Sequence, residues 1–284
     1  MLKGRLKNNS LALKLLLFVG IMALCGVCVL FAFVLAANTA GLKILQLIQS
    51  MAVFCLPCFI AAWLFDDRPA AFLSLDKKPQ VLTVVLVVVL MLSALPFINL
   101  IGWLNQHVHL PQFMSSVEQM LVEQEQAAEK LIESFLDVRT LGALLLNILV
   151  MALVPAFSEE LCFRGVLQTL FASNGRRWVA VWVCAIIFSA VHFQFYGFIP
   201  RMLLGALFGY LLAYSGSIWL PVIAHFTNNV AVVVLYYIFK VNGKDTALLD
   251  TFGTQDTLWA GIVSGMITLI LIILLFKILK KKNG

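Results

Sequence analysis

The chain has 284 residues, of which 62% are hydrophobic and only 12% are charged, and its mean hydropathy is +0.99. A soluble domain carries about 25% charged residues and about 45–50% apolar ones, so this composition excludes an ordinary soluble domain. It predicts an all-α fold, a polytopic bundle of helices surrounded by membrane lipids. The net charge of +6 comes largely from two basic tails, which suit membrane anchoring. Nucleic-acid binding is disfavoured, because no basic surface is interleaved with exposed aromatic residues.

Apolar runs predict about eight membrane spans, since a helix needs about 20 apolar residues to cross the hydrocarbon core. The spans lie at about 11–36, 45–64, 81–104, 141–171, 178–193, 199–214, 218–239 and 259–279. The first is longer than the apolar core of a signal peptide, so we expect it to be retained. The fourth should end at Ser173-Asn174-Gly175, because Asn-Gly ends helices. Without a repeat or a linker, residues 1–284 read as one domain.

The connection between the third and fourth spans, at 105–139, is too polar to cross the membrane. Residues 114–136 contain five glutamates and predict an amphipathic helix that lies at the surface or caps the bundle. His107 and His109 lie in the same connection, and we expect both to be solvated.

The basic residues of the loops agree with an even number of spans. Eight spans put both tails on one side, which we take as the cytoplasmic side of a prokaryotic inner membrane. Lys77, Lys78, Arg176 and Arg177 then fall on that side, and the acidic residues 114–136 fall on the other.

Six cysteines lie within or beside apolar runs, and two pairs of them have the C-x-x-C spacing that zinc or redox sites use. They are Cys25, Cys28, Cys55, Cys58, Cys162 and Cys184. On membrane helices such residues are more often small packing groups. We therefore expect packing roles and no disulfides.

Two acids and a base interrupt the fourth span. A carboxylate within a membrane helix is costly and indicates a functional site with a partner. Glu160 precedes Arg164 by four residues, the favourable order for an ion pair within a helix, so Arg164 should neutralise Glu160. Glu159 is rotated by about 100° from Glu160 and is left to face the bundle interior. There it is a candidate general base.

Two histidines on later spans each have a companion four residues away. The ring of Phe188 can pack against His192 and restrict its imidazole. His225 and Asn229 share one helix face, so their donors can point at a single oxygen, as an oxyanion hole requires. Together with Glu159 they favour a functional site over separate structural roles.

Helix lengths place the first two of these groups at the same depth. Counted from the turn at Arg176, both Glu159 and His192 lie about 25 Å along their helices. His225 lies only about 12–15 Å past the turn at 215–217, a mismatch that requires a tilt, a kink or a different inner boundary.

These residues resemble the three motifs of the CPBP (Abi) intramembrane proteases, relatives of CAAX prenyl endopeptidases and of bacteriocin-processing enzymes. The matching motifs are Glu159-Glu160-x-x-x-Arg164, Phe188-x-x-x-His192 and His225-x-x-x-Asn229, with Phe163-Arg164-Gly165 and the Gly216–Pro221 stretch around them. The resemblance covers about 141–235, which we take as the catalytic core segment. It implies hydrolysis of a peptide bond in a membrane-bound or lipidated substrate.

By that resemblance, Glu159 and His192 would activate a water, while His225 and Asn229 would bind the oxyanion. Glu160, Arg164 and Phe188 would support them. The family was named for presumed zinc dependence, and a zinc ion would have to be held by Glu159, His192 and His225, with Glu160 as a further candidate. H-E-x-x-H is absent, and His225 and Asn229 are explained as donors without an ion. We therefore favour a mechanism without a cofactor and keep zinc as the alternative.

Two other functions stay open at this stage. A proton-coupled transporter could use buried Glu and His as a relay, although it predicts a repeat that the sequence lacks. A non-catalytic immunity or scaffold protein could use the fold for binding alone. Elsewhere, Gly205 and Gly209 predict close helix packing. We expect Arg201 to be a boundary residue and Asn228 to cap or pack, away from the site.

Overall fold

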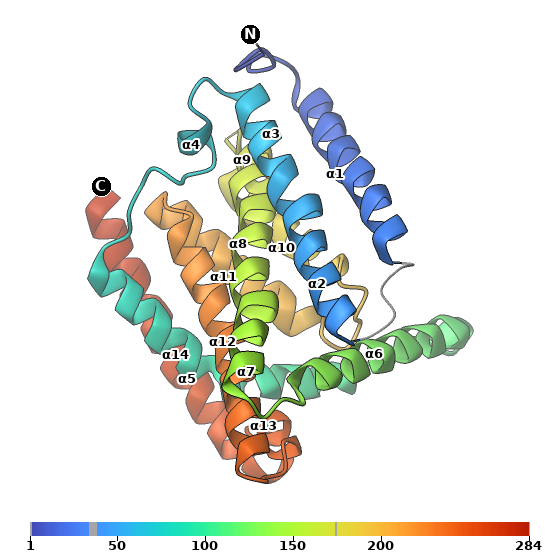
Figure 1. The fold of residues 1–284 in the computed structure, drawn as a ribbon. Coiled ribbons are helices and arrows are strands. Elements are labelled where there is room, and N and C mark those ends of the chain that lie inside the picture. The colour runs from blue at the N-terminus through green and yellow to red at the C-terminus, as the bar shows by residue number, and fades with distance from the viewer. Residues whose placement is uncertain (1, 34–38, 174, 284) are drawn as a thin grey trace.

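A computed structural model describes residues 2–33, 39–173 and 175–283, and this part of the chain is helical without strands (Figure 1). Residues 34–36 of the first expected span, and Asn174 of the expected turn, lie outside it. Seven segments of the described chain are long and apolar enough to cross a membrane. They are Leu11–Leu30, Gly41–Phe65, Val81–Gln106, Leu141–Ala172, Phe198–Ser215, Trp219–Val241 and Gln255–Lys281. The expected polytopic helical bundle is confirmed.

The fifth expected span is the exception in length. It forms α10 (Arg177–Ala190), an apolar helix of 14 residues. At 1.5 Å per residue, α10 extends about 21 Å, which falls short of a hydrocarbon core of about 30 Å. The chain then turns at residues 191–197 and returns as α11 (Phe198–Ser215). The described part of the chain thus has seven full-length spans and one short apolar helix, and the acidic connection packs against the α10–α11 turn.

Four of the full-length spans are built from a single helix each, and one consists of three successive helical pieces. The single helices are α1 (Leu11–Phe33), α5 (Val81–Gln106), α11 and α12 (Trp219–Val241). The second span comprises α2 (Thr39–Gln49), the π-type segment η1 (Ser50–Cys55) and α3 (Leu56–Phe65). The last helix, α14 (Leu258–Asn283), follows the short elements α13 (Ala247–Thr251) and η5 (Gln255–Thr257). It packs along α5 (Figure 1).

The N and C marks of the chain lie toward the same end of the bundle (Figure 1). Lys280 and Arg177 each lie over the ring of Tyr214 there, at 5.3 and 5.6 Å from its centroid. The Lys77 carbonyl accepts a hydrogen bond from the hydroxyl of Ser217 at the same end. A basic end is what the positive-inside rule expects at the cytoplasmic face. The assignment of that side stays a prediction.

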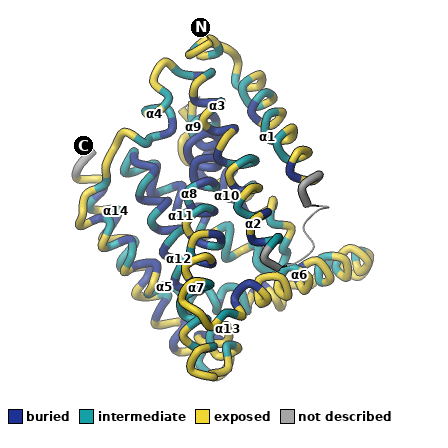
Figure 2. The backbone as a smooth tube through the Cα atoms, in the orientation of Figure 1, coloured by how far each residue is buried: buried dark blue, intermediate teal, exposed yellow. Residues whose placement is uncertain are grey.

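The fourth span is the most deeply buried element of the bundle. It runs through α7 (Leu141–Asn147), η3 (Ile148–Leu153), α8 (Val154–Glu160), η4 (Leu161–Gln168) and α9 (Thr169–Ala172). All eight residues of η4 are buried, whereas α1 and α6 are largely exposed (Figure 2). A helix buried on every side has no face left for lipid or water. Its polar side chains must therefore find partners within the protein.

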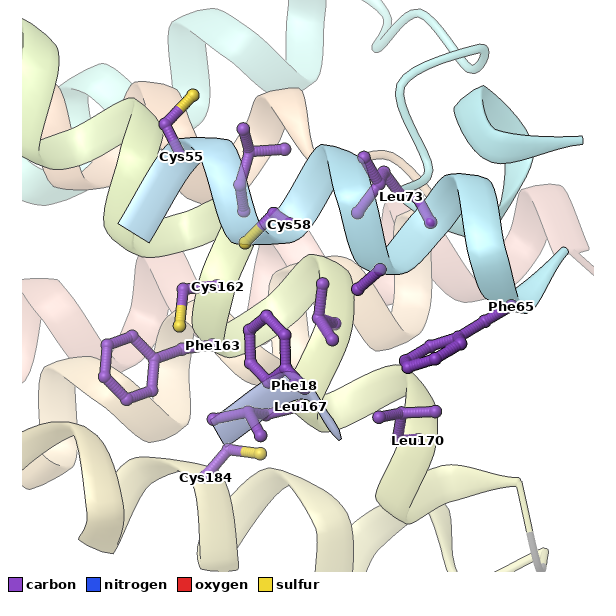
Figure 3. Close-up of a cluster of buried hydrophobic side chains, with 14 of the residues drawn as sticks. Phe18, Cys55, Cys58, Phe65, Leu73, Cys162, Phe163, Leu167, Leu170 and Cys184 are labelled. Carbon is purple, nitrogen blue, oxygen red and sulfur yellow. The ribbon is translucent and has the colours of Figure 1, made fainter. Parts of the chain in front are cut away.

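Aromatic and sulfur-containing side chains fill the space between η4 and its neighbours. Phe18, Phe65, Phe163 and Leu167 pack with cysteines in this cluster (Figure 3). All six cysteines of the chain are free, and Cys55, Cys58, Cys162 and Cys184 are buried. The expected packing role is therefore what these four residues have. The Sγ atom of Cys162 lies 3.9 Å from the Sδ atom of Met22, away from the acidic residues.

The acidic connection forms α6 (Ser115–Leu136), preceded by the short turn η2 (Gln112–Met114), and lies across the far end of the bundle (Figure 1). Its buried Glu125 accepts a hydrogen bond from the Tyr196 N–H at 2.9 Å, which ties α6 to the α10–α11 turn. Near its beginning, Glu118 accepts from the Tyr196 hydroxyl and contacts His109. The amphipathic helix predicted for 114–136 thus covers the turn.

Lys43 fixes the other end of α6. Its Nζ atom donates to the carbonyl of Phe135 at 3.1 Å and to Oδ1 of Asn147 at 2.7 Å, and the Asn147 amide donates to the same carbonyl. Lys43 is 6% exposed, so its charge is solvated by these oxygen atoms instead of water. The contact joins α2, α6 and α7.

The turn between α11 and α12 is held below the connection that contains α4 (Pro69–Phe72). The Ile218 N–H donates to the Ser74 carbonyl at 3.1 Å, and the Trp219 indole donates to the Leu75 carbonyl at 3.1 Å. Gly216 adopts the left-handed conformation, with φ of 66°, that ends α11. Because the connection covers this turn, α12 begins below the end of the bundle.

We predict that Glu125→Ala loosens α6 from the α10–α11 turn, because the Tyr196 N–H loses its acceptor. An unpaired buried donor costs about 1–3 kcal/mol, so amide exchange at Tyr196 should become about 10- to 100-fold faster. Hydrogen exchange followed by mass spectrometry would measure it. Glu123→Ala is the control, because Glu123 is exposed on the same helix. Unchanged exchange in Glu125→Ala would contradict the docking described above.

Candidate active site

Glu160 and Arg164 form a fully buried ion pair at the centre of the bundle. Nη1 of Arg164 lies 2.9 Å from Oε1 of Glu160, and both side chains are 0% exposed. The ion pair expected from their spacing is therefore present. Each charge has been removed from water, which costs several kcal/mol per ion unless further contacts compensate.

Further contacts surround the guanidinium of Arg164. Its Nη2 donates to the Gly205 carbonyl at 2.9 Å. The rings of Phe188 and Phe208 lie over it, with centroids 4.5 and 5.4 Å from Cζ. A Cβ atom added at Gly205 would come within 3.3 Å of Nη2 and 3.1 Å of the Phe188 ring. Only glycine lets α11 approach this closely, as the spacing of Gly205 and Gly209 predicts.

His225 shares the same carboxylate. Its Nδ1 lies 2.9 Å from Oε1 of Glu160, and the Phe208 ring stacks on the imidazole with centroids 5.3 Å apart. The Phe188 ring meets it edge-on at 5.9 Å. The imidazole is therefore oriented by Glu160 at one nitrogen, while Nε2 is left for another partner. Glu160 thus connects Arg164, on its own helix, with α12.

His192 lies in the α10–α11 turn and is oriented by the residue four positions before it. Its Nδ1 lies 2.8 Å from the Phe188 carbonyl, and the two rings pack edge to face at 5.2 Å, as the spacing predicts. A carbonyl only accepts hydrogen bonds, so Nδ1 carries the proton. In the neutral ring Nε2 then has a free lone pair, which is the form a proton acceptor needs.

A cavity of about 480 Å³ collects the residues that the sequence singled out as catalytic. Glu159, His192, His225 and Asn229 all line it, together with the support residue Phe188. Residues Ile132 and Leu136 of α6 line it as well, so α6 forms part of its wall. Three separate segments of the chain therefore bring an acid, two imidazoles and an amide to one cavity.

Two neighbouring asparagines, Asn228 and Asn229, line the cavity, whereas only Asn229 was expected there. Nδ2 of Asn229 donates to the Met151 carbonyl at 3.3 Å. Nδ2 of Asn228 donates to Oδ1 of Asn229 at 3.2 Å, which orients the Asn229 amide. The expectation that Asn228 faces away from the site was wrong, because the side chain turns back toward its neighbour.

Arg201 also lines the cavity, and its assignment as a boundary residue was wrong. The short α10 and the turn at 191–197 start α11 inside the bundle, so its first turn faces the cavity and not the membrane surface. Nη2 of Arg201 donates to Oε1 of Gln194 at 2.6 Å. The hint available in the sequence was the spacing of Arg201 and Gly205. Residues four apart lie on one face of a helix, and Gly205 was expected at a packed interface.

The depth mismatch expected for His225 is absent, because Nδ1 of His225 contacts Glu160 directly. The carbonyls of Ser74 and Leu75 accept hydrogen bonds from Ile218 and Trp219, so the connection around α4 packs against the start of α12. The two π-type segments of the fourth span, η3 and η4, lie directly before and directly after α8. They widen the helix on either side of the two acids.

The possible metal ligands that line the cavity do not fit a zinc ion in their observed arrangement. A catalytic zinc takes three protein ligands, such as His or carboxylate groups, around one point. In the described part of the chain no three His, Cys, Asp or Glu side chains are gathered in that way. Nδ1 of each imidazole is engaged by a carbonyl or by Glu160, so only Nε2 of each ring could contact an ion. We derive no reaction step through a metal, and metal dependence stays a prediction.

Comparison with known proteins finds a similarity for this segment. Residues 141–231 match the family model described as type II CAAX prenyl endopeptidase, Rce1-like. The uncharacterized protein YpbD of Bacillus subtilis (strain 168) is 33% identical over 84 residues. The match spans 28% of this chain and 40% of that protein's length. No solved structure matches the chain. The matched segment contains all the residues discussed as catalytic, and the resemblance to the CPBP family is confirmed over it.

We predict that Arg164→Ala destabilises the bundle strongly, because it leaves the Glu160 carboxylate buried without its main partner. Removing one member of a buried pair costs about 3–5 kcal/mol. Unfolding by SDS in mixed micelles would measure the loss. Arg139→Ala is the matched control, since this exposed arginine should change the free energy of unfolding by about 0.5 kcal/mol or less. Equal stability of the two variants would contradict the role given to the pair.

Proposed function

We propose that this integral membrane protein, whose residues 141–231 are those of the Rce1-like CAAX endopeptidase family, is an intramembrane endopeptidase that uses a glutamate and a histidine to activate water. The single observation that carries the proposal is the cavity shared by Glu159, His192, His225 and Asn229. Its substrate class is a membrane-bound or lipidated peptide. A site formed by membrane helices is reached most readily by a chain held in or at the lipid.

Glu159 and His192 are the groups that would handle the proton of the attacking water. Glu159 has no hydrogen-bond partner in the described structure that would occupy its carboxylate, and it lines the cavity. His192 presents a free Nε2, because its Nδ1 is engaged by the Phe188 carbonyl. A water between the two groups would be oriented by His192 and deprotonated by Glu159. General bases of this kind contribute about 10²–10⁴-fold to a rate.

His225 and Asn229 are the groups that would bind the oxyanion. The second N–H of the Asn229 amide is free, since the first donates to the Met151 carbonyl. His225 donates through Nε2 only when its ring is protonated, because Nδ1 faces Glu160. Donors fixed before the reaction stabilise developing charge without reorganisation.

The proposed reaction balances with these groups alone. The water oxygen forms a bond to the peptide carbonyl carbon as Glu159 takes one water proton, and the carbonyl oxygen becomes the oxyanion. When the tetrahedral intermediate collapses, the C–N bond breaks and Glu159 returns the proton to the departing amine. The products are a carboxylic acid and an amine, and Glu159 is again a carboxylate.

We predict that Glu159→Gln abolishes proteolysis while the protein still inserts and folds. The amide keeps the size of the side chain and cannot accept the proton, so activity should fall by about 10²–10⁴-fold. Quantitative proteomics of membranes containing either form would reveal peptides that accumulate uncut in the variant. Glu123→Gln, on the exposed face of α6, should cleave like the unmodified protein. Full activity of Glu159→Gln would refute the assignment of the base.

We further predict that removal of metal ions leaves proteolysis unchanged, because the proposed mechanism uses only protein groups. The purified protein would be incubated with 1,10-phenanthroline, dialysed, and assayed against the peptides identified above. Metal analysis of the active protein would be the companion measurement. Loss of activity that returns on addition of zinc would replace this mechanism by a metal-dependent one.

A further inference from the structure

Arg201 brings a positive charge to the site cavity without a counter-ion in contact. It is the fourth residue of α11 and lines the cavity together with Glu159 and His192. Among the described residues, no carboxylate forms an ion pair with it. The carboxylates of Glu125 and Glu159 act on it only through longer-range electrostatics. Its Nη1 atom is buried and has no hydrogen-bond partner.

Such a charge is unusual inside a membrane bundle. Charged groups at this depth are almost always paired with an opposite charge or with backbone carbonyls. The other buried cations of this structure follow that rule: Arg164 contacts Glu160 and a carbonyl, and Lys43 contacts a carbonyl and an amide oxygen. Nε of Arg164 is also without an acceptor, but that guanidinium contacts a carboxylate, whereas the guanidinium of Arg201 contacts only the amide oxygen of Gln194 and no anion. An anion that enters the cavity would supply the missing acceptor for its Nη1.

The guanidinium is also held in a fixed place. Nη2 donates to Gln194, and it lies so close to Gly197 that a Cβ atom added there would come within 2.9 Å of it. Gln194 and Gly197 belong to the turn that carries His192, so the guanidinium and the imidazole are positioned by one short segment. A planar guanidinium fixed in advance matches the geometry of a carboxylate and loses little entropy on binding it.

We propose that Arg201 binds a carboxylate of the substrate, so that the peptides cleaved here carry a negative charge near the scissile bond. The proposal rests on the proposed function in that the ligand is a peptide. It does not depend on which residue takes the proton. The carboxylate has two possible sources, the free C-terminus of the peptide or the side chain of an Asp or Glu residue.

Two other roles for Arg201 make different predictions. Arg201 could hold the turn through Gln194, or its charge could act on Glu159. Either role would affect all peptides equally, whether or not they carry a carboxylate. Discrimination between carboxylate and amide therefore separates substrate binding from both.

The test measures binding and not turnover. The full-length chain with Glu159→Gln would be placed in lipid nanodiscs with N-palmitoylated heptapeptides of randomised sequence that lack Asp and Glu. One pool ends in a free carboxylate and a second in an amide, and a third ends in an amide with one internal Glu. Bound peptides would be captured and quantified by mass spectrometry. A charge-assisted contact predicts about 10- to 100-fold enrichment of carboxylate peptides over amide peptides.

Variants of three residues assign the contact. Arg201→Gln should reduce the enrichment to about one while recovery of the amide pool stays unchanged. Gly197→Ala should reduce it without removing the charge, because the added Cβ displaces the guanidinium, and Arg201→Lys should retain part of it. These two variants and the comparison in the parent protein still decide the question if Arg201→Gln does not fold. Arg176→Gln, at the opposite end of α10, is the control and should change nothing.

Each outcome has a defined meaning. Enrichment of the first pool identifies a C-terminal carboxylate, and enrichment of the third pool identifies an acidic side chain. Equal recovery of all pools, or enrichment that persists in Arg201→Gln, would overturn the proposal. Cleavage of the same pools by the protein with Glu159 intact is followed in parallel. Its absence beside a clear enrichment would count against the protease function alone.

Discussion

The buried pair of Glu160 and Arg164 is the interaction on which the rest of the structure depends. Two charges without water are tolerated only when every neighbour contributes a contact, and here the neighbours come from different helices. Arg164 reaches the Gly205 carbonyl of α11, and Glu160 reaches His225 of α12. The pair therefore holds three spans in register, and the orientation of one candidate catalytic imidazole follows from it.

Phe188 extends this arrangement to the second imidazole. Its ring covers the Arg164 guanidinium and touches the rings of both His192 and His225, and its carbonyl accepts from His192. A side chain and a backbone oxygen of one residue thus position groups on either side of the cavity. Gly205 makes this possible, since a side chain there would collide with the Phe188 ring. The catalytic geometry is built mostly from packing around one buried cation.

The sequence predicts the local part of this site well. Spacing of four residues within one helix indicated the contact of Glu160 with Arg164 and that of Phe188 with His192, because such pairs need only a helix to meet. The pairing of His225 with Glu160 could not be obtained this way. This contact depends on where α12 begins, next to the connection around α4. The depths estimated from helix lengths did not include that connection.

The errors at Arg201 and Asn228 have a related cause. A charged residue at the beginning of an apolar run is ordinarily a boundary residue, and hydropathy gave no sign that α10 ends early. Once α10 is short, the beginning of α11 moves into the bundle and its first turn faces the cavity. The overall class of fold, by contrast, followed from composition and the length of apolar runs, which do not depend on how the helices meet.

The three attachments of α6 differ in strength along its length. Lys43 contacts the C-terminal end of α6 through buried hydrogen bonds, and Glu125 attaches the middle of the helix. The contacts of Glu118 near the beginning of α6 are made by exposed or half-buried groups. A helix that is attached firmly at its C-terminal end and weakly near its N-terminal end moves furthest at the N-terminal end. Any lifting of α6 would thus begin at the Ser115 end and would leave Ile132 and Leu136, at the Phe135 end, against the cavity longest.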